Sequence, residues 1–121
     1  MTSLTTTVKL CAVAITVAAS AVPAFAGSVG MASYYGREFH GRRCADGTRF
    51  NMNAMTAAHR SLPFGTKLSV TNLRNGRSVV VRVSDRGPFV RGRMLDLSYG
   101  AARALDFVRS GTAKVKIERL T

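Results

Sequence analysis

The sequence predicts a small, mainly β fold with one or two short helices, placed behind an N-terminal signal peptide. Residues 67–71, 77–84 and 113–120 alternate polar and apolar side chains, which is the period of a strand with one buried face. Asn75-Gly76 lies between the first two runs and is a strong signal of a hairpin turn. Cys44 is the only cysteine after residue 26, so no intramolecular disulfide can form there. The domain must therefore depend on core packing, as a closed barrel does.

The first 26 residues differ in composition from the rest of the chain. Lys9 is their only charged residue, residues 10–22 are apolar, and Ala24-Phe25-Ala26 fits the small-x-small rule for signal peptidase. The apolar run is short for a membrane span and no second one follows, so no span is expected after cleavage, although an uncleaved anchor is the alternative. Cys11 directly follows Lys9-Leu10, a poor context for lipidation. We therefore predict a signal peptide at 1–26, one domain at 27–121, and an unlipidated protein that is periplasmic or secreted.

The net positive charge of the domain predicts that it works among anionic partners. Residues 27–121 hold 17 basic and six acidic residues, a net charge of +11, and 14 of the basic residues are arginine. Nucleic acid, an acidic cell wall and anionic lipid head groups all suit such a surface. The export signal argues against nucleic acid as the normal partner.

The domain is predicted to begin with a strand over residues 29–36. Successive side chains of a strand point to opposite faces, so Tyr34 and Tyr35 are separated. One ring can then pack in the core while the other faces a groove, where its flat apolar surface suits a sugar. The sequence does not select which tyrosine is which, and both can also pack against the domain.

A long loop and a short helix are predicted next. Residues 37–53 are polar and rich in turn signals, and loops of this length in small domains are often functional. Phe39 and Phe50 are expected to pin this loop to the body. The Ala-rich residues 54–60 are expected to form one or two helical turns. His59 within them is either a hydrogen-bonded histidine or a proton carrier that meets a sugar hydroxyl.

The second half of the domain is predicted to be strand-rich. The hairpin around Asn75-Gly76 has one buried and one mostly solvated face. Residues 93–97 form a short strand, and Ser98 caps a helix over 99–107 whose apolar residues recur at helical spacing. Residues 113–120 form the last strand.

The run Ser84-Asp85-Arg86-Gly87-Pro88-Phe89 is the candidate site around which the chain is organised. The second hairpin strand ends on Asp85, one of six acidic residues, and Gly87-Pro88 then makes a turn. A carboxylate at a strand end beside an arginine and an aromatic residue suits a functional site. Alternatively, Asp85 accepts backbone N–H bonds at the turn or pairs with Arg86.

Other chemistries are weakly supported. His40-x3-Cys44 has a plausible ligand spacing, which His59 or Asp85 could complete, but no CxxC or HExxH frame accompanies it. A Cys44 nucleophile with His59 lacks the usual local signatures. No phosphate-cradling glycine motif is present. The sequence therefore predicts neither a metal nor another cofactor.

Residues 30–120 resemble the double-psi β-barrel domain of the rare lipoprotein A family, the septal-ring lytic transglycosylases. Eight short pieces in the right order carry the resemblance. They are Ala32-Ser33-Tyr34-Tyr35-Gly36, Phe39-His40-Gly41-Arg42, Thr56-Ala57-Ala58-His59, Leu62-Pro63-Phe64-Gly65-Thr66, Val70-Thr71-Asn72-Leu73, Asn75-Gly76-Arg77, Ser84-Asp85-Arg86-Gly87-Pro88-Phe89 and Arg93-x-x-Asp96-Leu97-Ser98.

The resemblance implies a six-stranded barrel with a groove, and cleavage of peptidoglycan between N-acetylmuramic acid and N-acetylglucosamine without water. The muramic acid 6-hydroxyl then attacks its own anomeric carbon, which gives a 1,6-anhydro product and needs only one acid/base carboxylate. Asp85 matches the catalytic aspartate and His59 the groove histidine. Asp96 is expected to be structural. The expected substrate contacts come from Tyr34, Tyr35, Thr48, Arg86 and Phe89.

Two further expectations concern Arg86 and the residue at position 48. An acid must hold its proton, which a paired arginine would disfavour, so Arg86 is expected to point away from Asp85 or to contact muropeptide carboxylates. Many family members carry Asn-Gly-Glu where this chain has Asp46-Gly47-Thr48. Loss of a positioned acid/base group costs about 10²–10⁴ in rate, unless Asp46 replaces it.

The missing glutamate keeps a second function open. The alternative is a non-catalytic, expansin-like module that binds peptidoglycan or another polysaccharide through its basic surface. In either case the expected partners are peptidoglycan glycan strands, and the protein is expected to be a monomer.

Overall fold

The computed structural model describes residues 27–121, and the predicted signal peptide lies outside the described residues. No helix within residues 27–121 is long and apolar enough to cross a membrane.

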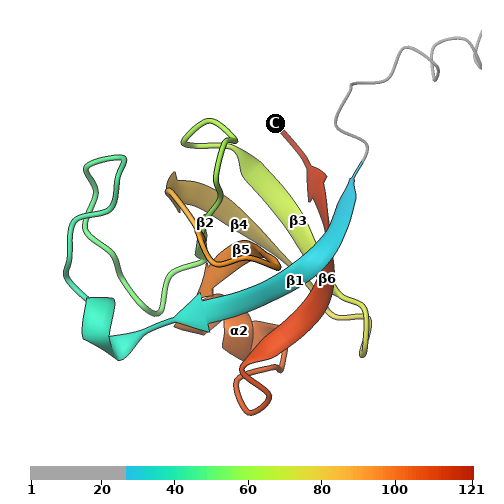
Figure 1. Cartoon of the computed structure of the whole chain (residues 1–121). Coiled ribbons are helices and arrows are strands. Elements are labelled where there is room, and N and C mark those ends of the chain that lie inside the picture. The colour runs from blue at the N-terminus through green and yellow to red at the C-terminus, as the bar shows by residue number, and fades with distance from the viewer. Residues whose placement is uncertain (1–26) are drawn as a thin grey trace, which may run out of the picture.

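Six strands close into a barrel (Figure 1) in the order β1-β5-β2-β4-β3-β6. The strands β1 and β5 pair in parallel, as do β2 and β4, and the other neighbours are antiparallel. Closure leaves no strand edge open to another chain. The strands are β1 (Ser28–Tyr35), β2 (Thr56–Ala58), β3 (Lys67–Asn72), β4 (Ser78–Asp85), β5 (Arg93–Ser98) and β6 (Thr112–Arg119). The predicted six-stranded barrel is therefore confirmed.

The predicted hairpin is the antiparallel pair β3–β4, and its turn contains Gly76 in the left-handed region at φ +78°. The alternation of the sequence places Val81 and Val83 inside, while Val80 is about half exposed on the outside. The interior of the barrel is filled by Leu68, Val70, Val81, Val83, Leu95, Leu97, Val115 and Ile117, each at most 1% exposed.

A short helix, α2 (Tyr99–Ala104), follows β5 and lies below the barrel in Figure 1. The Ser98 hydroxyl caps it by accepting the Ala101 N–H, as predicted. The helix ends before residue 107 because Asp106 adopts φ +60° and turns the chain. This turn places Phe107, which is 2% exposed, in the core cluster.

The predicted helical turns over residues 54–60 are wrong, because Thr56–Ala58 is the strand β2. It lies between β4 and β5 and bonds to both. Ala57 and Ala58 are almost fully buried. Two ladders of hydrogen bonds and burial outweigh the intrinsic helix preference of alanine, which amounts to less than about 1 kcal/mol per residue.

The segment between β1 and β2 projects from one side of the barrel (Figure 1) and begins with a short 3-10 turn, η1 (Arg37–Phe39). Phe50 anchors this segment as predicted: it is 4% exposed, and its ring stacks on Tyr35 with centroids 4.6 Å apart. Phe39 packs edge-on against the same tyrosine at 5.6 Å, although it is 39% exposed. Cys44, the one cysteine of residues 27–121, is buried and unpaired.

Candidate active site

A pocket of about 310 Å³ lies on the outside of the barrel where β1, β5, β2 and β4 are neighbours. Asp85, at the end of β4, is part of its wall. The full lining is Tyr34, Tyr35, Glu38, Phe39, Ala58, Asp85, Arg86, Arg93 and Asp96.

The strand register explains why two carboxylates share this pocket. Asp96 on β5 pairs with Ala58 on β2, and Ala58 pairs with Asp85 on β4. Adjacent strands are about 4.8 Å apart, so the two aspartate backbones are roughly 10 Å apart, with a small residue between them. Ser33 on β1 extends the row on the far side of Asp96. Asp96, which was expected to be structural, stands inside β5 and lines the pocket.

The Asp85 carboxylate is held by backbone groups. Its Oδ1 accepts N–H bonds from Ala45 and Arg86, both at 2.9 Å, and its backbone carbonyl accepts the His59 N–H at 3.1 Å. The interpretation of Asp85 as a turn acceptor is thus correct for Oδ1. Among residues 27–121, however, no basic side chain forms an ion pair with Asp85.

The Arg86 guanidinium points away from Asp85, as expected. Its Nη1 donates to the carbonyl oxygens of Leu62 at 2.8 Å and His59 at 3.2 Å. The guanidinium carbon lies 3.9 Å from the ring centroid of Phe64. Arg86 therefore fastens the segment after β2 to the end of β4, and it also lines the pocket.

His59 lies next to this arrangement but does not line the pocket. Its Nδ1 accepts the backbone N–H groups of Ser61 and Leu62, each at 3.1 Å, so the neutral ring carries its proton on Nε2. Burial lowers the pKa of His59, and the positive charges of Arg60 and Arg86 lower it further. The imidazole is therefore a neutral hydrogen-bond donor at neutral pH, not a charged group.

Thr48 lies on the loop tip beyond the pocket lining. Its hydroxyl and backbone N–H both donate to Asp46 Oδ1, while Arg82 Nη1 lies 3.2 Å from Asp46 Oδ2. Burial acts to raise the pKa of Asp46, but the bonds from Thr48 and Arg82 outweigh it and the pKa is lowered overall. Asp46 is therefore held ionised and is poorly suited to replace the missing acid.

The two tyrosines play different parts. The Tyr34 hydroxyl donates to the Val108 carbonyl at 3.0 Å, and its ring packs on Tyr99 and Phe107. Tyr35 stacks on Phe50, so one face of its ring is covered and is not a sugar platform. Burial raises the pKa of Tyr35, and the charge of Asp85 adds to this, so its phenol stays protonated.

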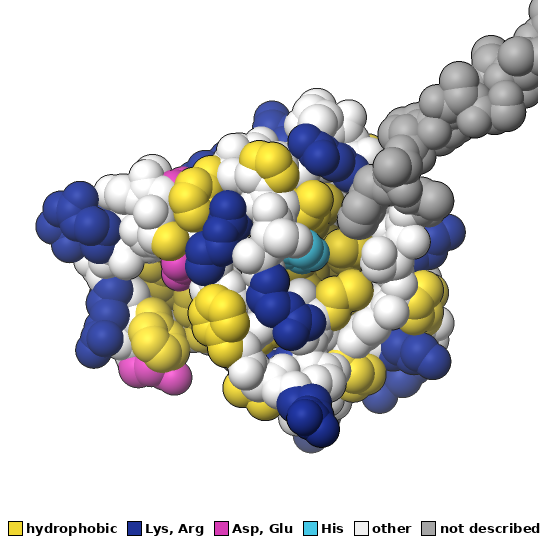
Figure 2. Space-filling model, turned by 45° about the horizontal axis from the view of Figure 1, so that its top comes forward, with side chains coloured by type: hydrophobic (Ala, Val, Ile, Leu, Met, Phe, Trp, Pro, Cys, Tyr) yellow, Lys and Arg dark blue, Asp and Glu magenta, His cyan; other side chains and the backbone are white. Residues whose placement is uncertain are grey.

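Exposed apolar and basic side chains are interspersed around a histidine on the face shown in Figure 2. Phe89 is 78% exposed and follows the Gly87–Pro88 turn outside the pocket lining. Burial, followed by the charge of Asp85, raises the pKa of the Cys44 thiol, which disfavours a thiolate nucleophile. Within residues 27–121, no three His, Cys, Asp or Glu side chains are grouped to hold a metal ion.

Sequence reasoning missed three charged residues of the pocket: Glu38, Arg93 and Asp96. Ser33 Oγ donates to Asp96 Oδ1 at 2.6 Å, and Arg93 Nη2 lies 3.2 Å from the same oxygen. The alternation of residues 93–97 could have placed Asp96 opposite Leu95 and Leu97, on the outer face. No local signal could have placed Glu38 beside Asp85.

The closed barrel and its pocket define a double-psi β-barrel protein with carboxylates on its outer face. The family model described as "Lytic transglycolase" matches residues 27–117, so the chain belongs to that family. The resemblance to the rare lipoprotein A family is thereby confirmed.

Named relatives agree with this membership. The chain is 64% identical over 89 residues to the "Probable endolytic peptidoglycan transglycosylase RlpA" of Synechocystis sp., covering 74% of this chain and 28% of the relative. It is 56% identical over 89 residues to the "Endolytic peptidoglycan transglycosylase RlpA" of Campylobacter jejuni, covering 74% and 32%. The chain thus spans about a third or less of the length of these relatives.

Solved structures share the fold. The apo expansin of Clavibacter michiganensis has a TM-score of 0.64 and 26% identity, covering 78% of this chain and 50% of that one. A mutant of that expansin in complex with cellohexaose matches with the same TM-score and coverage at 23% identity. The Streptomyces papain inhibitor has a TM-score of 0.62 and 21% identity, covering 83% and 100%. At such identities, the last two show the fold alone.

Proposed function

We propose that this chain is an exported lytic transglycosylase. It cleaves the bond between N-acetylmuramic acid and N-acetylglucosamine in peptidoglycan and leaves 1,6-anhydro ends. The observation that supports this most directly is the Asp85 carboxylate on the pocket wall, fixed through Oδ1 and unpaired with any basic side chain of residues 27–121. The relatives named as peptidoglycan transglycosylases support the substrate class.

Asp85 is the proposed acid/base. Its proton passes to the glycosidic oxygen as the bond from that oxygen to the anomeric carbon breaks. The muramic acid 6-hydroxyl oxygen bonds to the same carbon, and the proton of that hydroxyl passes to the Asp85 carboxylate. No water is consumed. Arg86 leaves Asp85 free for this role, because its guanidinium is bound to the carbonyl oxygens of Leu62 and His59.

The other proposed site residues act around Asp85. The His59 backbone N–H holds the Asp85 carbonyl, and its neutral Nε2–H is a donor for a sugar oxygen at the rim. Tyr34, Tyr35 and Arg86 contribute walls, and Phe89 offers an exposed apolar face beyond them. Thr48 supports Asp46 and the loop tip. The protein is proposed to act as a monomer outside the cytoplasm.

Muropeptide mass analysis tests this proposal. Purified sacculi are incubated with the wild-type protein and with Asp85→Asn, and sacculus pull-down is run on the same samples. The amide oxygen of asparagine can accept the N–H bonds of Ala45 and Arg86, so the variant is expected to fold and bind. We expect 1,6-anhydro products with the wild type and none with Asp85→Asn. If neither protein releases product and both bind sacculi, the chain is instead a wall-binding module, which the threonine at position 48 favours.

A further inference from the structure

The acidic residues of this basic domain fall into two groups. Three of the six form ion pairs: Asp46 with Arg82 at 3.2 Å, Asp96 with Arg93 at 3.2 Å, and Glu118 with Lys116 at 3.8 Å. Glu38, Asp85 and Asp106 form none among residues 27–121. An acid without an ion pair is unexpected among so many arginines, and two of these three line one pocket.

Glu38 stands where two cavities meet. Besides the pocket that holds Asp85, it lines an adjoining cavity of about 640 Å³. The two cavities share Tyr34, Tyr35, Glu38 and Arg93. A polymer laid along both cavities must pass Glu38 on its way to Asp85.

The backbone of the turn at Glu38 is held by neighbouring residues, and its side chain is exposed. It belongs to η1, where the Phe39 N–H donates to the Gly36 carbonyl at 2.9 Å. The Phe39 ring packs on Tyr35, and Tyr35 is in turn stacked on Phe50. The turn that presents Glu38 is therefore tied to β1, while Asp85 approaches from β4.

We propose that Glu38 is a second catalytic carboxylate, and that in its ionised form Glu38, in place of Asp85, accepts the proton of the muramic acid 6-hydroxyl, while Asp85 remains the acid. This inference rests on the proposed transglycosylase function. It supplies a carboxylate that the sequence lacks at position 48, from a different part of the same loop. Asp46 and Asp96 are less suited to this role, because the carboxylate of each already accepts a hydrogen bond and forms an ion pair.

The proton balance closes with this division of roles. The proton of Asp85 passes to the glycosidic oxygen as the bond from that oxygen to the anomeric carbon breaks. The 6-hydroxyl oxygen bonds to the anomeric carbon and its proton passes to Glu38. Asp85 then ends ionised and Glu38 protonated, and exchange with solvent restores both. No other reactant is needed.

The pH profile depends on the groups that face Glu38. Across the two cavities these are Arg37 from its own turn, Tyr34 and Tyr35 from β1, Asp85 from the end of β4, Arg86 directly after β4, Arg93 and Asp96 from β5, and Tyr99 from α2. The reaction needs Glu38 ionised and Asp85 protonated, so the wild-type rate is expected to be bell-shaped in pH. Without a carboxylate at position 38, the acidic limb disappears and the rate falls only as pH rises.

The test compares Glu38→Gln, Glu38→Asp and a matched control, Glu118→Gln, on sacculi. Glu118 is the only other glutamate in the chain, and its ion pair with Lys116 lies outside both cavities. We expect Glu38→Gln to release anhydro products about 10²–10⁴ times more slowly, with sacculus binding and thermal melting close to those of the control. Glu38→Asp should recover part of the rate and the acidic limb. The Glu118→Gln rate should match the wild type.

Two results overturn the inference. If the wild type is active and Asp85→Asn is not, but Glu38→Gln matches Glu118→Gln in rate and pH profile, the transglycosylase function stands and Glu38 has no part in the chemistry. If the wild type releases no anhydro product, the proposed function and the role of Glu38 fail together.

Discussion

The contacts of Arg86 give a stability prediction that separates a structural from a substrate-binding arginine. We consider Arg86→Met, which keeps a long apolar side chain and removes the guanidinium. In the structure, that group donates to the Leu62 and His59 carbonyls and covers the Phe64 ring. The substitution leaves both carbonyl oxygens without this donor.

The magnitude follows from these three contacts. Hydrogen bonds from a charged donor contribute about 1.5–3 kcal/mol each when buried, and Arg86 is only half buried, so we take about 1–1.5 kcal/mol for each. The cation–π contact adds about 0.5–1 kcal/mol, part of which a methionine sulfur on the same ring retains. We therefore expect Arg86→Met to lower the free energy of unfolding by about 2–4 kcal/mol. For a domain of this size the melting temperature should fall by roughly 10–30 °C.

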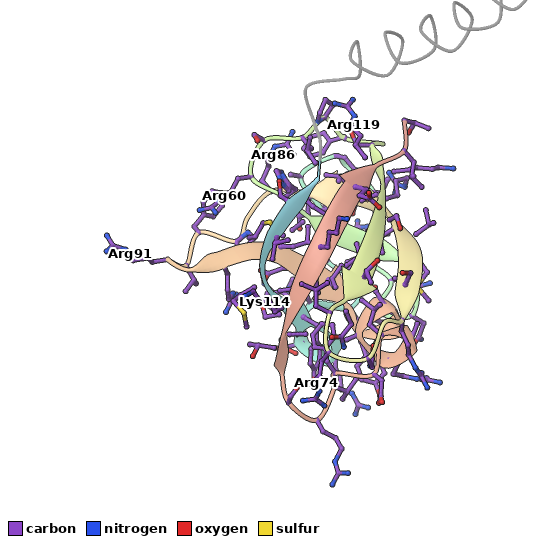
Figure 3. All side chains as sticks on the ribbon, turned by 90° about the vertical axis from the view of Figure 1, so that its right-hand side faces the viewer. Arg60, Arg74, Arg86, Arg91, Lys114 and Arg119 are labelled. Carbon is purple, nitrogen blue, oxygen red and sulfur yellow. The ribbon has the colours of Figure 1, made fainter. Side chains whose placement is uncertain are left out.

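Thermal and urea unfolding measure this, with Arg91→Met as the matched control. Arg91 extends away from the barrel (Figure 3), so the same change there is expected to alter the free energy of unfolding by less than about 0.5 kcal/mol. Equal stability of the two variants would show that the Arg86 guanidinium does not fasten the segment after β2. Strong loss of sacculus binding at unchanged stability would instead make Arg86 a substrate contact.

Two further predictions concern packing and protonation. A Cβ at Gly100 would lie 2.6 Å from the Asn53 carbonyl oxygen, so Gly100→Ala should force the backbone before β2 to shift. We expect the substitution to lower the free energy of unfolding, measured in urea, by about 1–3 kcal/mol. Wild-type stability of the variant would mean that the Asn53 backbone moves aside at no cost. The pKa of His59 is lowered in the folded protein, so the unfolded chain binds the proton more tightly. The stability that the neutral ring contributes should therefore be present above about pH 6.5 and be lost as the pH falls. The side-chain oxygen of His59→Asn can accept the N–H groups of Ser61 and Leu62 but does not titrate. The melting temperature of this variant should therefore depend less on pH between about 7 and 5 than that of the wild type. An identical pH dependence would contradict the lowered pKa of His59.

Local sequence patterns predicted part of the candidate site but not the contacts of its side chains. The sequence located Asp85 at the end of a strand, because an alternating run followed by Gly-Pro determines where the strand stops. Its place on the pocket wall depends on the pairing of β2 with β4, whose register shifts between Ala57 and Ala58. The expectation that Arg86 turns away from Asp85 was also correct. Its actual partners, the Leu62 and His59 carbonyls, lie more than 20 residues earlier in the chain and could not be read from its neighbours.

The sequence by itself determined the strands with strong alternation, the Asn75-Gly76 hairpin and the Ser98 cap, because each depends on side-chain period or on hydrogen bonds within a few residues. Only the tertiary structure decided that residues 56–58 form a strand, since their partners come from β4 and β5 on either side. The same pairing places Asp96 one strand away from Asp85, across Ala58. The packing of Phe39 and Phe50 on Tyr35 ties down the turn that carries Glu38 at the pocket. These are contacts between residues far apart in the chain, and barrel closure, not local propensity, brings them together.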